Sequence, residues 1–237
     1  MHRIMTEYSG NTDLSCPSCH LRSPLFCWLN DEELSLVRDN KITIRFKVGE
    51  TIRKQGMPMS HVVSVNSGLV KLYLEGVEDR NAIIRIVKPT NFIGGPGLYL
   101  DQMHHFTVSA LMDSTLCLID IKIFKQLIEQ NKNFAEEFLK DFSRNILSVY
   151  NRLVCLTQKQ MPGRMADTLL YLFEDVFESP RFELSLSKQD LADLSAMSKD
   201  SAVKILRLFQ NEGMIRSEGD GLELLDIEAL RKISRIG

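Results

Sequence analysis

The sequence of 237 residues predicts an α+β protein: a β-rich domain, then one long helix, then a winged helix-turn-helix. Three patterns predict this order. Short apolar strands separated by single glycines occupy residues 41–121, an apolar repeat of helical period occupies 135–156, and two capped helices with a hairpin end the chain. Because a chain of this length holds two domains comfortably, we expect a separate domain on each side of the helix.

The composition is that of an ordinary globular protein, with 44% hydrophobic and 25% charged residues. No apolar run approaches the ~20 residues that span a bilayer, and residues 1–10 hold no signal-peptide core, so we expect a cytoplasmic location. The net charge is −2, and from Gln160 onward there are 10 Lys and Arg against 14 Asp and Glu. Any contact with DNA must therefore use a local basic stripe, because overall attraction is absent.

The β-rich domain is expected to follow a short acidic helix over 29–37, which Asn30 can cap. Apolar and polar residues then alternate from Ile42 to Phe46, and this change of period marks the first strand. Single glycines recur at roughly ten-residue spacing after it. This rhythm predicts a β-barrel, sandwich or roll, closed by a final strand pair over 106–121.

The long helix carries apolar residues that step by four and three through three heptads. So narrow a stripe favours a partner helix, most simply the same helix of a second copy, although packing on its own domain is the alternative. Met161-Pro162-Gly163 is expected to break the helix at the domain boundary. The repeat starts at Ala135, and the predicted dimer contacts are Leu139, Phe142, Ile146, Val149, Leu153 and Leu156.

Beyond that boundary the pattern matches a winged helix-turn-helix, which is two short helices joined by a tight turn and followed by a hairpin. Polar caps and glycines locate each element. The expected elements are a helix over 164–176, a strand over 184–186, a helix over 188–194 capped by Ser187, a helix over 199–211 capped by Ser198, and a hairpin around Gly219 and Gly221.

The second helix of this unit offers one charged face for DNA, while Ala202, Ile205 and Phe209 form its apolar face. In the major groove lysine can donate to guanine and aspartate can accept from cytosine. A merely solvated charged face is the alternative. The predicted DNA contacts are Lys199, Asp200, Val203 and Lys204 at base edges, Lys188, Ser187, Ser201 and Arg207 at phosphates, and Ser198 at the helix start.

Five cysteines cannot all pair with one another. Cys16, Cys19 and Cys27 gather near the start, Cys117 falls on an expected strand, and Cys155 lies on the long helix off its seam. In a reducing compartment, unpaired or metal-bound thiols are expected. The first four therefore favour a redox or gas switch, with Cys155 as a bystander, whereas simple burial of Cys27 and Cys117 is the alternative.

Several stretches along the chain fall in register with one known pattern. They are Phe46-Lys-Val-Gly-Glu50, Gln55-Gly56, Val65-Asn-Ser-Gly68, Asn91-Phe-Ile-Gly94 with Gly97-Leu98, Asp190-Leu-Ala-Asp-Leu194, Ser198 to Arg207, and Glu212-Gly-Met-Ile215. From residue 16 to residue 233 the chain resembles the CRP/FNR family of bacterial transcription regulators. The resemblance implies a cyclic-nucleotide-binding-like β-roll, a homodimer on an inverted-repeat DNA site, and contact with RNA polymerase. The implied domains are a cysteine-bearing segment at 1–28, the roll at 29–128, the dimerisation helix at 129–160, and the winged helix-turn-helix at 161–237.

The resemblance also implies what is sensed. Oxygen-sensing members of the FNR branch hold a [4Fe–4S] cluster, and their ligands match Cys16, Cys19, Cys27 and Cys117. Oxidation of such a cluster would loosen the dimer seam. Members that bind cyclic AMP use a glutamate and an Arg-Ser pair, which here match Gly95 and His105-Phe106, so we do not expect that ligand.

Further signals stay open at this point. Haem is suggested by the adjacent His104 and His105, of which only one can reach an iron if they lie on a strand. A zinc site or thiol switch, with His20 as a further ligand, and a small ligand in the roll are also compatible with the sequence. No Ser-His-acid pattern, phosphate loop or paired-carboxylate motif indicates catalysis, so we expect no enzyme. At the base-reading positions Asp200 and Lys204 replace the family's usual Glu and Arg, which changes the expected half-site.

Overall fold

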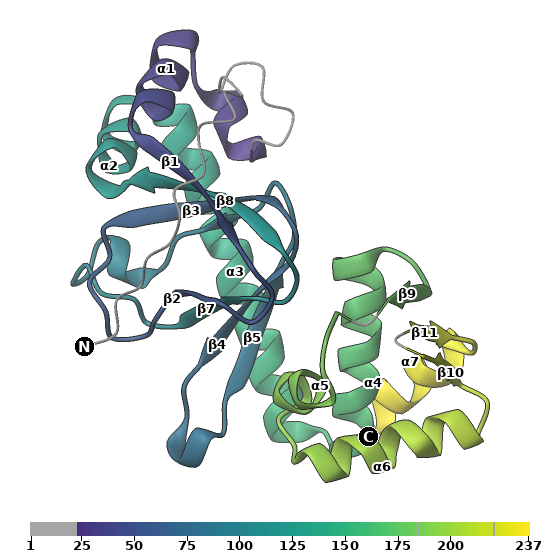
Figure 1. The fold of residues 1–237 in the computed structure, drawn as a ribbon. Helices are drawn as coiled ribbons and strands as arrows, with labels where there is room; N and C mark the ends of the chain where they lie inside the picture. Colours follow the sequence, from purple (N-terminus) through teal and green to yellow (C-terminus); the bar gives the residue numbers. More distant parts are fainter. Residues whose placement is uncertain (1–22, 184, 220) are drawn as a thin grey trace.

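The computed structural model describes residues 23–183, 185–219 and 221–237, and it confirms the predicted α+β architecture (Figure 1). A β-roll forms the N-terminal domain, the long helix α3 (Lys132–Gln158) runs along it, and a mostly helical C-terminal domain follows. Cys16, Cys19, His20 and Leu184 lie outside the described residues. No helix within the described ranges is long and apolar enough to cross a membrane.

Two four-stranded antiparallel sheets form the roll, and their inner faces share one core in which Val65, Val70 and Leu116 are fully buried. Two strands form over 106–121 as expected, but they do not pair with each other. They belong to different sheets, because a bend at 111–113 carries the chain from one sheet to the other. The first sheet has the order β1 (Lys41–Phe46), β8 (Ser114–Asp120), β3 (His61–Ser67) and β6 (Phe92–Ile93); the second has β2 (Thr51–Arg53), β7 (Thr107–Ala110), β4 (Val70–Leu74) and β5 (Ala82–Val87).

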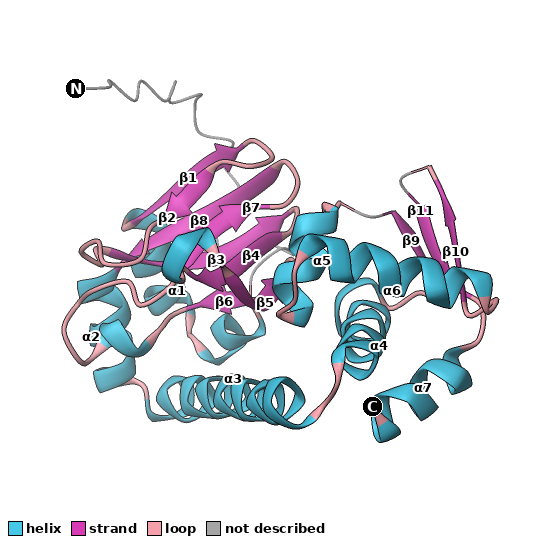
Figure 2. Cartoon of the chain, turned by 90° about the horizontal axis from the view of Figure 1, so that it is seen from below, coloured by secondary structure: helices cyan, strands magenta, loops and turns pink. Residues whose placement is uncertain are grey.

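Helices cover the outer face of the first sheet and form a second core with it (Figure 2). Phe124 and Phe134 are fully buried there, and Phe92 stacks on Phe124 with 4.8 Å between ring centroids. The predicted acidic helix begins at the expected cap, because Asn30 Oδ1 accepts a hydrogen bond from Glu33 N at 2.9 Å. The elements are η2 (Pro24–Trp28), α1 (Asp31–Asp39) and α2 (Ile121–Gln130), with two further turns, η3 (Val77–Asp79) and η4 (Pro96–Leu98), in the roll.

α2 was not predicted, although Ile121, Phe124 and Leu127 recur every three residues on its buried side. It ends at Asn131, whose Oδ1 accepts a hydrogen bond from Phe134 N at 3.0 Å and so caps α3. One side of α3 lies along the roll, and its opposite side faces away from the described elements (Figure 2).

The C-terminal domain begins after Lys159 and Gln160. The expected break at the domain boundary is present, because α3 ends at Gln158, and Met161-Pro162-Gly163 then forms the first turn of α4, where proline fits since the amide hydrogens of that turn have no helical partner. The strand predicted over 184–186 is misplaced, whereas the caps Ser187 and Ser198 are confirmed. The elements are α4 (Met161–Tyr171), the π-helical turn η5 (Leu172–Phe177), β9 (Arg181–Glu183), α5 (Lys188–Ser195), α6 (Lys199–Asn211), β10 (Ile215–Glu218), β11 (Gly221–Leu224) and the unpredicted α7 (Ile227–Ile236).

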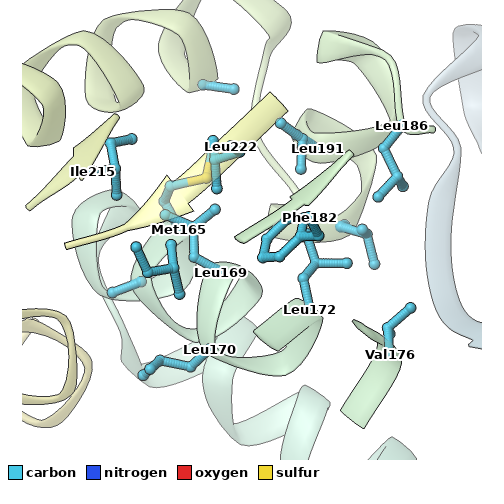
Figure 3. Close-up of a cluster of buried hydrophobic side chains, with 14 of the residues drawn as sticks. Met165, Leu169, Leu170, Leu172, Val176, Phe182, Leu186, Leu191, Ile215 and Leu222 are labelled. Atoms are coloured by element: carbon cyan, nitrogen blue, oxygen red, sulfur yellow. The ribbon is translucent and has the colours of Figure 1, made fainter. Parts of the chain in front are cut away.

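One apolar core runs through the C-terminal domain, with Met165, Leu169 and Leu172 fully buried (Figure 3). Ile83 and Ile86 of β5 belong to the same core. The C-terminal domain is therefore packed against the second sheet of the roll.

Candidate nucleic-acid interface and cysteine site

Hydrogen bonds fix both the start of α5 and the turn that joins it to α6. At the start of α5, Ser187 Oγ accepts from Asp190 N at 3.1 Å, and Asp190 Oδ2 accepts from Ser187 N at 2.9 Å. Ala196 ends the helix in the left-handed region at φ 45°, and Arg164 Nη1 of α4 donates to its carbonyl oxygen at 2.9 Å. The two helices are thus held at a fixed turn, as a helix-turn-helix requires.

The reading face of α6 is exposed as predicted. Ala202, Ile205 and Phe209 are buried against the C-terminal core, so the opposite face points to solvent. Among the ion pairs of the described residues, none uses the charged groups of this face. Lys199, Asp200, Lys204 and Arg207 are exposed, Val203 and Ser201 are half-buried beside them, and Lys188 is exposed at the start of α5.

The serines of this unit serve its caps. Ser198 Oγ accepts from Ser201 N at 3.2 Å and donates to Ser201 Oγ at 2.9 Å. Ser187 Oγ likewise donates to Asp190 Oδ2 at 2.6 Å. The hydroxyl protons of Ser187 and Ser198 are engaged in these caps, whereas the hydroxyl of Ser201 accepts in its bond with Ser198 and can donate to phosphate beside the lysines and Arg207.

The wing formed by β10 and β11 adds little positive charge. Arg216 pairs with Glu223 at 3.2 Å, and Glu218 lies on the same hairpin. Electrostatic attraction to nucleic acid must therefore come from α6 and the start of α5.

The outer side of α3 is apolar and uncovered within the described structure. Leu139, Leu147 and Leu153 are 60%, 60% and 59% exposed, and Tyr150 is 59% exposed. Water-exposed leucines in such a row are unusual on a monomer and mark an interaction surface. We call this surface the α3 stripe; it comprises the exposed Leu139, Leu147, Val149, Tyr150, Leu153 and Val154 together with the half-buried Ile146.

The α3 stripe is rotated relative to the predicted seam. Phe142, Ile146 and Leu156 are half-buried, and Phe142 stacks on Phe138 of the same helix at 6.3 Å, so this edge of the predicted seam is partly covered within one chain. The sequence pattern missed three stripe residues. They are Leu147, Tyr150 and Val154. Each is an apolar residue directly after a predicted seam position, and this doubling of apolar residues is the sequence signal that would have found them.

The described cysteines occupy three different environments. Cys27 is exposed on η2, whereas Cys117 and Cys155 are buried. Cys117 Sγ lies 3.5 Å from Thr43 Oγ1 and accepts from Lys41 Nζ at 3.9 Å. The thiol of Cys117 is thus covered by a flexible lysine side chain, which can move aside more easily than a packed apolar core.

Cys117 and the segment that carries Cys27 share one face of the first sheet. Cys117 is paired with Ser64, which is paired in turn with Phe92, so about 10 Å separates Cys117 from Phe92 across two strand spacings. The ring of Phe92 packs edge-on against Phe26 at 6.4 Å, and Phe26 precedes Cys27. Among the described residues no three His, Cys, Asp or Glu side chains are grouped for a metal, and Cys16 and Cys19 lie outside that part of the chain.

Cys155 differs from Cys27 in its chemistry. Burial and then the hydrogen bond with Asp167 raise the pKa of Cys155 to about 11. Its thiolate at pH 7.5 is therefore roughly 100-fold scarcer than that of an ordinary thiol. In metal-free protein we expect iodoacetamide to alkylate Cys27 and leave Cys155 unmodified, as measured by peptide mass spectrometry. Equal labelling of the two would contradict this environment.

The turn at residues 94–97 is tightly packed. A Cβ on Gly95 would lie 3.3 Å from the ring of Phe106, and one on Gly97 would meet the carbonyl oxygen of Met103. The two histidines precede β7 in a loop, not on a strand as expected. His104 is buried, while His105 is exposed and its Nε2 lies 3.1 Å from Asp101 Oδ1.

Two parts of the chain match known protein families. Residues 43–131 match the cyclic nucleotide-binding domain, and residues 163–233 match the Crp-like helix-turn-helix domain. The transcriptional regulatory protein btr of Bordetella pertussis is 23% identical over 227 residues, which cover 92% of each chain. The transcriptional activator protein anr of Pseudomonas aeruginosa is 23% identical over 184 residues, which cover 76% of this chain and 75% of that protein. The structure of FixK2 from Bradyrhizobium japonicum has a TM-score of 0.75 at 16% identity, and the match covers 81% of this chain and 96% of that one.

The two matched domains stand on either side of α3, in the order in which the roll and the helix-turn-helix follow one another here. The btr and anr proteins are regulators of transcription, which agrees with the exposed reading face of α6. The chain therefore belongs to the CRP/FNR family of DNA-binding transcription regulators.

Proposed function

We propose that the protein acts as a homodimer that reads an inverted-repeat DNA site with its two α6 helices. The observation that carries this proposal is the α3 stripe, an exposed apolar row on the same chain as a solvent-facing reading helix. A two-fold dimer through α3 would bury the stripe against itself, and each fully buried leucine would contribute roughly 2 kcal/mol. Such a dimer presents two reading helices, and a two-fold protein matches a palindromic site. RNA polymerase is the further partner that the family resemblance suggests.

The contacts with bases are assigned to the first two turns of α6. Lys204→Ala is expected to weaken specific binding about tenfold, because a lysine contact with a guanine edge is worth ~1–3 kcal/mol. Binding to unrelated DNA should weaken far less. Electrophoretic mobility shifts on a selected operator and on a scrambled duplex measure the two affinities.

Lys188 is the matched control, since it is an exposed lysine at a helix start beside the reading face. Lys188→Ala should weaken specific and non-specific binding by the same factor. It should also reduce the slope of log affinity against log salt concentration by about one, as expected for the loss of one phosphate contact. If Lys204→Ala behaves in this same way, Lys204 contacts only phosphate and the base assignment fails.

The proposed signal is a redox-labile iron–sulfur cluster held by Cys16, Cys19, Cys27 and Cys117. Two observations support it: Cys117 and the Cys27 segment lie on one face of the first sheet, and a lysine, not packed core, covers Cys117. When bound, a [4Fe–4S] cluster supplies a centre that oxygen can degrade. The chain's own part is to bring thiolates from η2 and β8 together beside α3, which packs on the same face.

Cyclic AMP is not the proposed ligand, because the ring of Phe106 packs against the turn where a nucleotide-binding relative carries its glutamate. A haem-bound gas, another small ligand in the roll, and a zinc or thiol switch are the competing signals.

Anaerobic purification with iron and sulfide analysis tests the signal. We expect about four irons and four sulfides per chain, with absorption near 400 nm that bleaches in air. Cys117→Ser should lose both elements, and Cys155→Ser, the matched buried thiol, should keep them. Cluster binding should also protect Cys27 from alkylation.

If the reconstituted protein contains neither iron nor sulfide, the proposal of an iron–sulfur cluster is overturned. A Soret band would indicate haem instead, and one zinc per chain would indicate the zinc switch. None of these results would affect the proposal for DNA binding.

A further inference from the structure

The reading unit is bound to the β-roll by an ion pair that links the two domains. Lys71 Nζ of β4 donates to Asp190 Oδ1 of α5, and their side chains are only 21% and 10% exposed. Asp190 is also the residue that closes the cap of α5 through Ser187. One carboxylate therefore joins the start of the helix-turn-helix to a strand 119 positions away in sequence.

A second polar contact lies beside this pair. The hydroxyl of Tyr171, at the end of α4, accepts from Ile86 N at 2.9 Å and donates to Ile86 O at 3.3 Å. β5 is an edge strand, so this hydroxyl satisfies backbone groups that no neighbouring strand pairs. The pKa of Tyr171 is raised by burial, which keeps the hydroxyl protonated.

Apolar packing surrounds both contacts. Leu69, Ile83, Ile86 and Leu111 of the roll belong to the same buried core as the C-terminal domain. β5 also contacts α5 in the same region. With the C-terminal domain packed against the roll in this way, Lys199, Lys204 and Arg207 stay exposed, so this arrangement of the domains is compatible with DNA binding.

We propose that Lys71 is a positioning residue for DNA recognition, which acts through Asp190. It fixes the orientation of α5, and hence of α6, relative to the roll and to α3. In a two-fold dimer the two reading helices must meet half-sites about 34 Å apart, so a rotation of either unit changes the spacing that both can reach. This inference rests on the proposed dimeric function.

Tolerance of half-site spacing tests the inference, because a purely structural role would not change it. The wild-type protein first selects a duplex from a randomised 40-base-pair library. Affinity is then measured for that duplex and for versions with one or two base pairs inserted or deleted between the half-sites. For the wild type, a two-base-pair change in spacing should lower the binding affinity about 30-fold, which is the size of effect expected when a specific site is disrupted.

For Lys71→Met, the same change in spacing should lower the affinity less than about fivefold. This variant should also bind the selected duplex roughly fivefold more weakly than the wild type, since each helix-turn-helix unit then samples more orientations. Lys71→Arg should keep the wild-type spacing profile, because it can re-form the ion pair. Lys47→Met is the matched control: it removes an exposed roll lysine paired with Asp113 at 2.8 Å. Its profile should also be that of the wild type.

A wild-type spacing profile for Lys71→Met would overturn the inference while leaving the dimeric regulator intact. Failure of the wild type to select any two-half-site duplex would overturn the proposed function itself, and the inference with it. Circular dichroism checks the folding of each variant. If Lys71→Met does not fold, Asp190→Asn gives the same comparison, because an amide oxygen can still accept from Ser187 N.

Discussion

Leu153→Glu is expected to convert the dimer to a monomer at micromolar concentration and to weaken operator binding by about 100-fold. Leu153 is 59% exposed near the C-terminal end of the α3 stripe. In a two-fold dimer the substitution places two carboxylates near one another in an apolar interface, where neither has a partner. DNA binding falls because two linked reading units bind far more tightly than one. Analytical ultracentrifugation and mobility shifts measure the two effects.

Leu100→Glu is the matched control, since Leu100 is 76% exposed in the roll and lies outside the α3 stripe. It should leave both the oligomeric state and DNA affinity unchanged. A Leu153→Glu protein that still sediments as a dimer would place the subunit contact somewhere other than the α3 stripe.

Phe124→Ala is expected to lower the free energy of unfolding of the roll by about 3–5 kcal/mol, the usual cost of removing a fully buried phenylalanine. Phe124 has no exposed surface, and its ring contacts Phe92, Phe134 and Phe138 with centroids 4.8, 5.4 and 5.4 Å away. Collapse around the cavity is resisted because these rings come from a strand and from α3. Urea unfolding followed by the single tryptophan, Trp28, measures the change.

Tyr99→Ala is the comparison, because Tyr99 is an exposed aromatic that packs only against Lys125 among its ring contacts in the described structure. Its cost should stay below about 1 kcal/mol. If the two substitutions cost the same, the phenylalanine cluster does not hold the roll, η2 and α3 together. Phe26 belongs to that cluster, so loosening it should also displace the segment that carries Cys27.

Patterns of neighbouring residues were enough to predict most helices and strands. Asn30, Ser187 and Ser198 cap their helices as expected, since a cap depends on hydrogen bonds to residues only three positions away. The hairpin of β10 and β11 follows from glycines in the same local way. The same local logic placed the charged face of α6 in solvent, because its apolar face had to be buried.

Errors arose where the outcome depended on distant residues. The pairing of β7 and β8 with different sheets cannot be read from either strand, because both are compatible with several neighbours. The π-helical turn at the end of α4 and the true position of β9 follow from packing against β11 and the apolar core.

The functional surfaces, too, were partly predictable from the sequence and partly known only from the folded structure. Local periodicity and residue type already indicated a reading helix, an apolar α3 and a set of clustered thiols, because each depends on the chemistry of a short segment. The exposed side of α3, the lysine over Cys117 and the ion pair between Lys71 and Asp190 became known only from the folded chain. Each depends on residues tens of positions apart, which are brought together by the burial of a shared core and not by any local preference.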